Sequence, residues 1–65
     1  MRLNDFAVLE RGERIVVIVY ELRNASHEEV FTVTGEPFDA NTLVPAVDET
    51  GHKHSIYFRD VLRRF

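Results

Sequence analysis

The sequence predicts a small all-β domain in which five short antiparallel strands form a barrel or a strongly bent sheet, with a short C-terminal helical turn. Two observations lead to this prediction. Apolar and polar residues alternate along much of the chain with a period of two, the pattern of strands that bury one face. Clusters of Gly, Pro, Asn and Asp interrupt these runs about every 8 to 12 residues, a spacing typical of small barrels and sandwiches.

The length and composition allow one globular domain over residues 1–65. Of the 65 residues, 45% are hydrophobic and 29% are charged, an ordinary balance for a folded domain. The longest apolar run, residues 15–20, is far shorter than the roughly 20 residues that span a bilayer. No basic segment leads into an apolar stretch at the start of the chain, so we expect no signal peptide and a cytoplasmic location. The absence of cysteine excludes disulfides, a thiolate zinc site and a cysteine nucleophile.

The first three predicted strands cover residues 6–10, 14–23 and 29–34. Residues 14–23 contain a run of β-branched side chains, which favours extended structure. Residues 29–34 alternate in polarity, as expected of a strand with one buried face. Gly12 lies in the turn between the first two strands, where a residue free to adopt a positive φ is favoured.

The last two predicted strands cover residues 42–48 and 53–58. Because Pro45 has no N–H to donate, we expect the strand that contains it to lie at an edge of the sheet or to carry a bulge. Gly51 occupies the hairpin turn between the two strands. In residues 59–65 the apolar positions follow an i, i+1, i+4 spacing, which predicts a single α or 3₁₀ turn that packs on the barrel mouth.

The closing part of the chain resembles the small SH3-like barrels, including KOW-type modules. In those modules a hairpin whose turn contains Gly is followed by a short strand and one helical turn. The matching order here runs through Val30-Phe31-Thr32-Val33, Leu43-Val44-Pro45-Ala46-Val47, Asp48-Glu49-Thr50-Gly51, Ile56-Tyr57-Phe58 and Asp60-Val61-Leu62. KOW modules begin with a basic, Gly-rich segment, whereas the corresponding region here is acidic and has Pro37 in place of the loop Gly. Their roles on ribosomes and polymerases are therefore not carried over.

Charge is unevenly distributed along the chain. Residues 1–27 are balanced, residues 28–49 carry a net charge of −6 with no Lys or Arg, and residues 50–65 carry +3. The overall charge of −3 makes phosphate binding a poor default expectation. Arg outnumbers Lys by seven to one, which favours bidentate contacts of the kind found at interfaces.

Residues 15–22 are apolar on both faces of the predicted strand. A domain of this size is marginally stable alone, and a wall of a single-layer barrel would leave one of these faces in water. One interpretation is that the chain's own ends cover the outer face, with Met1, Leu3 and Phe6 or with Val61, Leu62 and Phe65. The other is a protein interface, most simply a homodimer. The predicted interface residues are Val16, Ile18, Tyr20 and Leu22, because aromatic residues are favoured at interfaces.

A second candidate surface combines aromatic and basic residues near the end of the chain. Small barrels bind single strands by stacking bases on exposed aromatic rings beside basic groups. The possible nucleic-acid contacts are Tyr57, Arg59, Arg63 and Arg64. In the alternative interpretation, either Tyr57 or Phe58 fills the core and the two terminal arginines are simply solvated.

Metal and catalytic sites are weakly indicated. His52 and His54 are spaced to share one face of a strand, but only two nitrogen ligands are local, so a polar hairpin tip is favoured over a metal site. Ser26 and His27 are neighbours, and neighbouring side chains seldom converge as a nucleophile and its base must. The sequence therefore predicts no enzyme, no cofactor and no small-molecule substrate.

Together these observations predict a non-enzymatic, self-associating protein-interaction module with no membrane contact. The alternative is a small nucleic-acid-associated barrel that binds RNA or DNA through its basic C-terminal surface.

Overall fold

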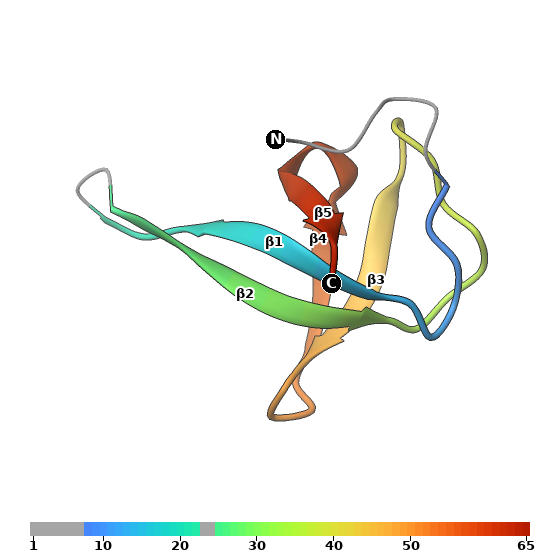
Figure 1. Cartoon of the computed structure of the whole chain (residues 1–65), viewed down its shortest axis with the longest axis horizontal. Coiled ribbons are helices and arrows are strands. Elements are labelled where there is room, and N and C mark those ends of the chain that lie inside the picture. The colour runs from blue at the N-terminus through green and yellow to red at the C-terminus, as the bar shows by residue number, and fades with distance from the viewer. Residues whose placement is uncertain (1–7, 23–24) are drawn as a thin grey trace.

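The structure, a computed structural model, describes residues 8–22 and 25–65 and forms one antiparallel sheet. The strands lie in the order β4-β3-β2-β1-β5, and a 3₁₀ turn, η2, connects β4 to β5 (Figure 1). The all-β prediction is confirmed. The elements are β1 (Arg14–Tyr20), β2 (Ser26–Val33), β3 (Leu43–Asp48), β4 (Lys53–Tyr57), η2 (Phe58–Asp60) and β5 (Val61–Arg64).

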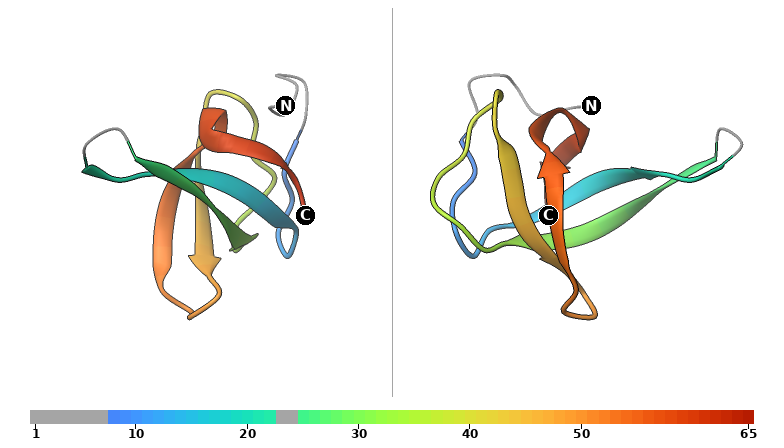
Figure 2. Two further views of the ribbon diagram at one scale, coloured as in Figure 1. Left: turned by 60° about the vertical axis from the view of Figure 1, so that its left-hand side comes forward. Right: turned by 180° about the vertical axis from the view of Figure 1, so that it is seen from behind.

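β1 and β2 form a long, twisted hairpin whose far end extends away from the other strands as an arm (Figures 1 and 2). Pairing between the two strands continues to Tyr20 and Ser26. β2 therefore begins three residues before the predicted strand 29–34, because the cross-strand hydrogen bonds with β1 extend it through a polar stretch. The β3–β4 hairpin crosses this arm steeply at its base. The sheet is not closed, and β4 and β5 are its two edges.

The core lies on one face of the bent sheet and draws on every strand. Ile15 and Val17 of β1 are buried there, whereas Ile18 and Tyr20 on the opposite face are not. This difference between alternate residues follows from the period-two geometry of a strand. Apart from Val16, all buried hydrophobic residues form a single cluster, which comprises Leu9, Ile15, Val17, Phe31, Val33, Val44, Ala46, Ile56, Phe58 and Val61.

The predicted strand over residues 6–10 is wrong in its described part. Leu9 forms only an isolated bridge, in which its N–H and carbonyl pair with those of Phe38 at 2.9 and 2.8 Å. Leu9 is nonetheless completely buried, so its apolar character reflects burial rather than strand formation. Residues 6 and 7 lie outside the described residues. The turn at Gly12 is as predicted, with φ at +85°.

The predicted helical turn over residues 59–65 is also wrong beyond Asp60. The 3₁₀ turn ends there, and Val61–Arg64 forms β5, the fifth strand of the sheet. Val61 pairs with Val17 and Arg63 with Val16, so Leu62 is the extra residue of a β-bulge. A bulge places two successive residues opposite one residue of the partner strand, which produces adjacent apolar positions without a helix.

Pro45 does not mark an edge strand, because β3 lies between β2 and β4. Its carbonyl accepts a hydrogen bond from the Thr34 N–H at 2.9 Å, one residue beyond the last β2–β3 pair, Val33 and Ala46. In an antiparallel sheet the N–H and C=O of one residue point to the same side. An N–H at Pro45 would have pointed to Thr34, just beyond the end of β2. The absence of this N–H therefore removes no hydrogen bond between β2 and β3.

We predict that Gly35→Ala destabilises the fold by about 1–3 kcal/mol, the usual cost of overpacking. A Cβ at Gly35 would lie 2.8 Å from the Phe38 ring and 2.9 Å from Pro45 Cγ. Thr34→Ala is the control, because its side chain is exposed and the expected change is within about 0.5 kcal/mol. Chemical denaturation measures both variants, and equal stability of Gly35→Ala and the wild type would contradict the packing described here.

Candidate interaction surfaces

The outer face of β1 becomes steadily more exposed toward the tip of the arm. Val16 is 5% exposed, Tyr20 is 60% exposed and Leu22, just beyond the strand, is 89% exposed. Ile18 is half-buried between them. The sequence prediction of an apolar outer row therefore needs one correction, since Val16 is buried within the chain itself.

An ion pair covers Val16. Arg63 of β5 and Glu28 of β2 lie on the two strands that flank β1, and their side chains meet at 2.7 Å. Their register partners on β1 are Val16 and Ile18 respectively, so the ion pair crosses the outer face of β1 directly above these residues. The aliphatic part of an arginine side chain covers apolar surface well while its charged end remains hydrated.

The C-terminal residues contribute less to this cover than one interpretation of the sequence expects. Val61 faces the core, and Leu62 is half-buried in the bulge. Phe65 packs under the Arg14 guanidinium, 4.5 Å from its ring centre, and remains 69% exposed. Met1, Leu3 and Phe6 lie outside the described residues.

Two of the four possible nucleic-acid contacts stack on each other. Arg59 lies over the exposed ring of Tyr57 at 4.7 Å from its centre. Arg63 is paired with Glu28 as described above, and Arg64 bonds the Glu13 carboxylate and donates to the Val8 carbonyl at 2.9 Å. The two terminal arginines are thus engaged in intramolecular contacts.

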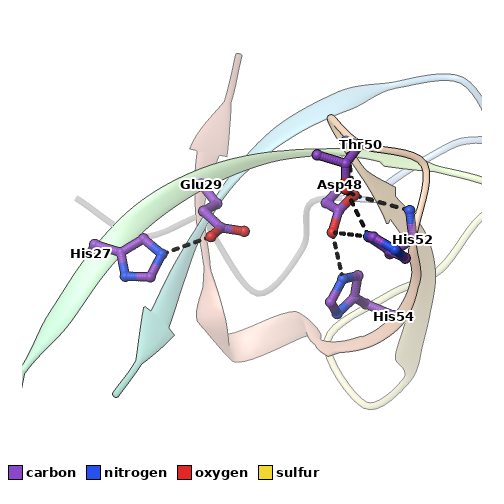
Figure 3. A network of polar contacts seen from close by, with 6 residues as sticks. All are labelled: His27, Glu29, Asp48, Thr50, His52 and His54. Atoms are coloured by element: carbon purple, nitrogen blue, oxygen red, sulfur yellow. Dashed lines mark hydrogen bonds and ion pairs between the residues drawn. The ribbon is translucent and has the colours of Figure 1, made fainter. Parts of the chain in front are cut away.

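The β3–β4 hairpin is organised by the carboxylate of Asp48 (Figure 3). One oxygen accepts from the Thr50 N–H at 2.9 Å, the Thr50 hydroxyl at 2.7 Å and the His52 N–H at 3.0 Å. The other oxygen contacts His54 Nε2 at 2.9 Å. The hydrogen bonds from the Thr50 hydroxyl and then from His54 hold the pKa of Asp48 well below its ordinary value. Gly51 completes the turn with φ at +90°.

These contacts place His52 and His54 around one carboxylate at the hairpin tip. The ring of His54 also packs edge-on against Phe31, with centroids 5.1 Å apart. Within the described ranges no group of three or more His, Cys, Asp or Glu side chains could hold a metal ion.

His27 lies on the arm between the carboxylates of Glu21 and Glu29. Figure 3 shows its contact with Glu29. Its Nε2 contacts Glu29 at 2.7 Å and its Nδ1 contacts Glu21 at 3.1 Å. The hydrogen bond with Glu29, aided by the negative charge of Glu21, raises the pKa of His27 above its ordinary value. Ser26 precedes it on the opposite face of β2, so the two side chains do not form a nucleophile–base pair.

A groove of about 410 Å³ separates the arm from β4. Its apolar lining comes from Val17, Val19, Phe31 and Ile56, and its polar lining includes Glu29, Asp48, His54 and Asp60. Ile18, Tyr20, Ser55 and Tyr57 also line it. A neighbouring hollow of about 350 Å³ shares Glu29 and Asp48 and adds Glu28 and Glu49. The sequence suggested neither hollow, because both depend on how far the arm diverges from the β3–β4 hairpin.

Comparisons with protein-family models, with curated proteins and with solved structures gave no match. No helix in the described part of the chain is long and apolar enough to cross a membrane.

We predict that Glu29→Gln lowers the pKa of His27, measured by NMR titration of its imidazole protons. The neutral amide removes the charged partner that makes the largest contribution to the raised pKa. Glu28→Gln is the matched control, because Glu28 lies on the opposite face of β2 and pairs with Arg63. A wild-type pKa at or below 6.5, or equal effects of the two variants, would contradict this assignment.

The same contact has a defined effect on stability. Because the pKa of His27 is raised in the folded state, its contribution to the free energy of unfolding is fully present below a pH of about 6.5 and is lost as the pH rises through the folded pKa. His27→Gln should therefore be less stable than the wild type under mildly acidic conditions and should approach it at alkaline pH. Denaturation curves at the two pH values measure this difference, and a gap that widens with rising pH would contradict the prediction.

Proposed function

We propose that this chain is a non-enzymatic protein-interaction module that self-associates through the outer face of the arm. The residues that carry the interface are Ile18, Tyr20 and Leu22. The supporting observation is the exposure of Tyr20 and Leu22 on a hairpin that projects beyond the core. Exposed large apolar side chains that lie together mark interaction surfaces more often than scattered ones do.

The energy available at this surface is large for a domain of this size. Fully burying a large apolar side chain contributes about 1.5–3 kcal/mol, and small domains have total stabilities near 5 kcal/mol. A two-fold arrangement, in which the same arm residues of two copies pack together, would cover both apolar faces at once. The ion pair of Glu28 and Arg63 would lie at the rim of such an interface, where polar residues are typical.

The proposed binding role agrees with the kind of fold that the chain resembles. The Gly51 hairpin, β4 and η2 follow one another in the order on which the resemblance to SH3-like barrels rests. We propose that the sheet is an open relative of those barrels, in which β4 and β5 do not join. Such a scaffold would present surfaces for binding rather than an enclosed catalytic site.

A nucleic-acid-associated barrel is the second candidate function. The observation in its favour is the exposed ring of Tyr57 with Arg59 stacked over it, since aromatic and guanidinium planes both stack on bases. The engagement of Arg63 and Arg64 in ion pairs leaves fewer cations for phosphate contacts, so this candidate ranks below self-association.

We predict that the wild-type protein forms dimers at micromolar concentration and that a Tyr20→Lys/Leu22→Lys variant is monomeric. The introduced charges would have to be buried in the dimer, which is unfavourable. Leu43→Lys is the control, because it adds the same charge at an exposed leucine outside the arm. Sedimentation equilibrium measures the mass, and a wild-type mass of 7.6 kDa at all concentrations would rule out self-association.

The nucleic-acid candidate makes a separate prediction. Fluorescence anisotropy with a labelled oligo(dT) should show binding that weakens in Tyr57→Ala and falls steeply as salt rises. Tyr20→Ala removes a similarly exposed tyrosine from the arm and should leave any binding unchanged. Equal losses in the two variants would contradict a Tyr57 stacking site.

A further inference from the structure

We propose that the groove between β4 and the arm binds an extended segment of a partner protein, which adds to the free edge of β4 and carries alternating apolar and basic side chains. This surface is distinct from the outer face of the arm. It is defined by three independent features of the described residues: unpaired backbone edges, an apolar floor and a carboxylate rim.

The free edge of β4 is identified by the hydrogen-bond pattern of the β3–β4 hairpin. The Pro45 carbonyl points toward β2, where it accepts from Thr34, so its register partner Ser55 forms a pair without hydrogen bonds to β3. The N–H and C=O of Ser55 therefore point away from β3. By alternation the same holds for Lys53 and Tyr57. Their three N–H groups and the carbonyls of Lys53 and Ser55 form a row of unpaired donors and acceptors, the template that an added strand requires, whereas the Tyr57 carbonyl belongs to the η2 turn.

The opposite wall is unpaired only toward the tip of the arm. The N–H of Glu21 donates to the Ala25 carbonyl, which fixes the alternation along β1. Ile18 and Tyr20 consequently direct their backbone groups away from β2, toward the side on which β5 lies. The last pair of β1 with β5, Val17 and Val61, directs the Ile18 N–H toward the Asp60 carbonyl, so the Tyr20 groups are the ones that lie beyond the pairing. The free edge of β4 therefore provides most of the unpaired backbone of the groove.

The groove has an apolar floor that fits side chains of an added strand. Val17, Phe31 and Ile56 are core residues whose surfaces line its base. Alternate residues of a bound strand would point down to this floor and the others outward.

The carboxylates around the groove indicate that a bound segment would carry basic side chains. Glu29 and Asp48 line the groove together with Asp60, which has no ion-pair partner within the described ranges. In the neighbouring hollow, Glu28 and Glu49 are already paired with Arg63 and Arg14, so the negative charge of the groove comes from Glu29, Asp48 and Asp60. Basic side chains of a bound segment would therefore be favoured over acidic ones, and they would accelerate its association.

The experiment uses two capped nine-residue peptides, one with alternating Val and Lys and one with alternating Val and Glu. NMR titration of the full-length protein should show binding of the Lys peptide and no detectable binding of the Glu peptide. On binding, the amides of Lys53, Ser55 and Tyr57 should become protected from hydrogen exchange, because they gain hydrogen-bond acceptors. Failure of the Lys peptide to bind, or equal binding of both, would overturn the proposal.

Two pairs of variants locate the site. Ser55→Pro removes an N–H that points away from β3, so it should leave the hairpin intact and abolish binding. Ser55→Ala keeps the N–H and should bind the peptide like the wild type.

Asp60→Asn should weaken binding of the Lys peptide about two- to fivefold, the range of one exposed ion pair. Glu36→Gln is the control, because Glu36 lies outside the groove and its loss should not change the affinity.

The outcomes separate this site from the arm. Binding to a folded Ser55→Pro variant at wild-type strength would overturn strand addition. If Ser55→Pro does not fold, the exchange protection of the three wild-type β4 amides decides, and its absence overturns the proposal. If Ser55→Pro dissociates a dimer and neither peptide binds, a second copy of the chain occupies this edge and the proposal is wrong.

Discussion

The incomplete pairing of β1 determines the rest of this structure. β1 lies next to β2 along its whole length, but β5 pairs with it only from Ile15 to Val17. The reason lies in the connection from β4, because the η2 turn directs the chain back toward β1 and β5 has only four residues. The first half of β1 is therefore the inner strand of a packed sheet. Its second half has one partner strand and extends outward with β2 as an arm.

Several interactions follow from this division. Where β1 lies between two strands, Arg63 and Glu28 can meet across it and cover Val16. Beyond that point residues 8–22 and 25–65 provide no third strand, and Tyr20 and Leu22 are exposed. The inner face of the arm places His27 between two carboxylates, and the separation of the arm from β4 leaves the groove. The core, the candidate interface and the groove thus share one structural origin.

The sequence predicted those features that depend on local backbone chemistry. The two turn glycines, Gly12 and Gly51, have the positive φ that their positions implied. The burial of Ile15 and Val17 on one face of β1 follows from alternation alone.

Features that depend on distant residues were missed. The ion pair that covers Val16 joins residues 35 positions apart, and nothing in the local pattern indicates it. The sequence also did not indicate β5, because the bulge at Leu62 produces adjacent apolar residues with a spacing like that of a helix. Nor did it place Pro45 in an inner strand, which is possible because β2 ends beside the N–H that Pro45 lacks. The groove could not be predicted either, because it depends on the geometry of two hairpins.

Native-state hydrogen exchange at low protein concentration tests the partial pairing of β1 most directly. The amides of Val17 and Val19 point toward β2 and should be protected, whereas that of Tyr20 points to the unpaired side and should exchange rapidly. Val16, which pairs with Arg63, should be protected on that same side. Protection of Tyr20 equal to that of Val19 would contradict the account, because it would require a strand beside the second half of β1.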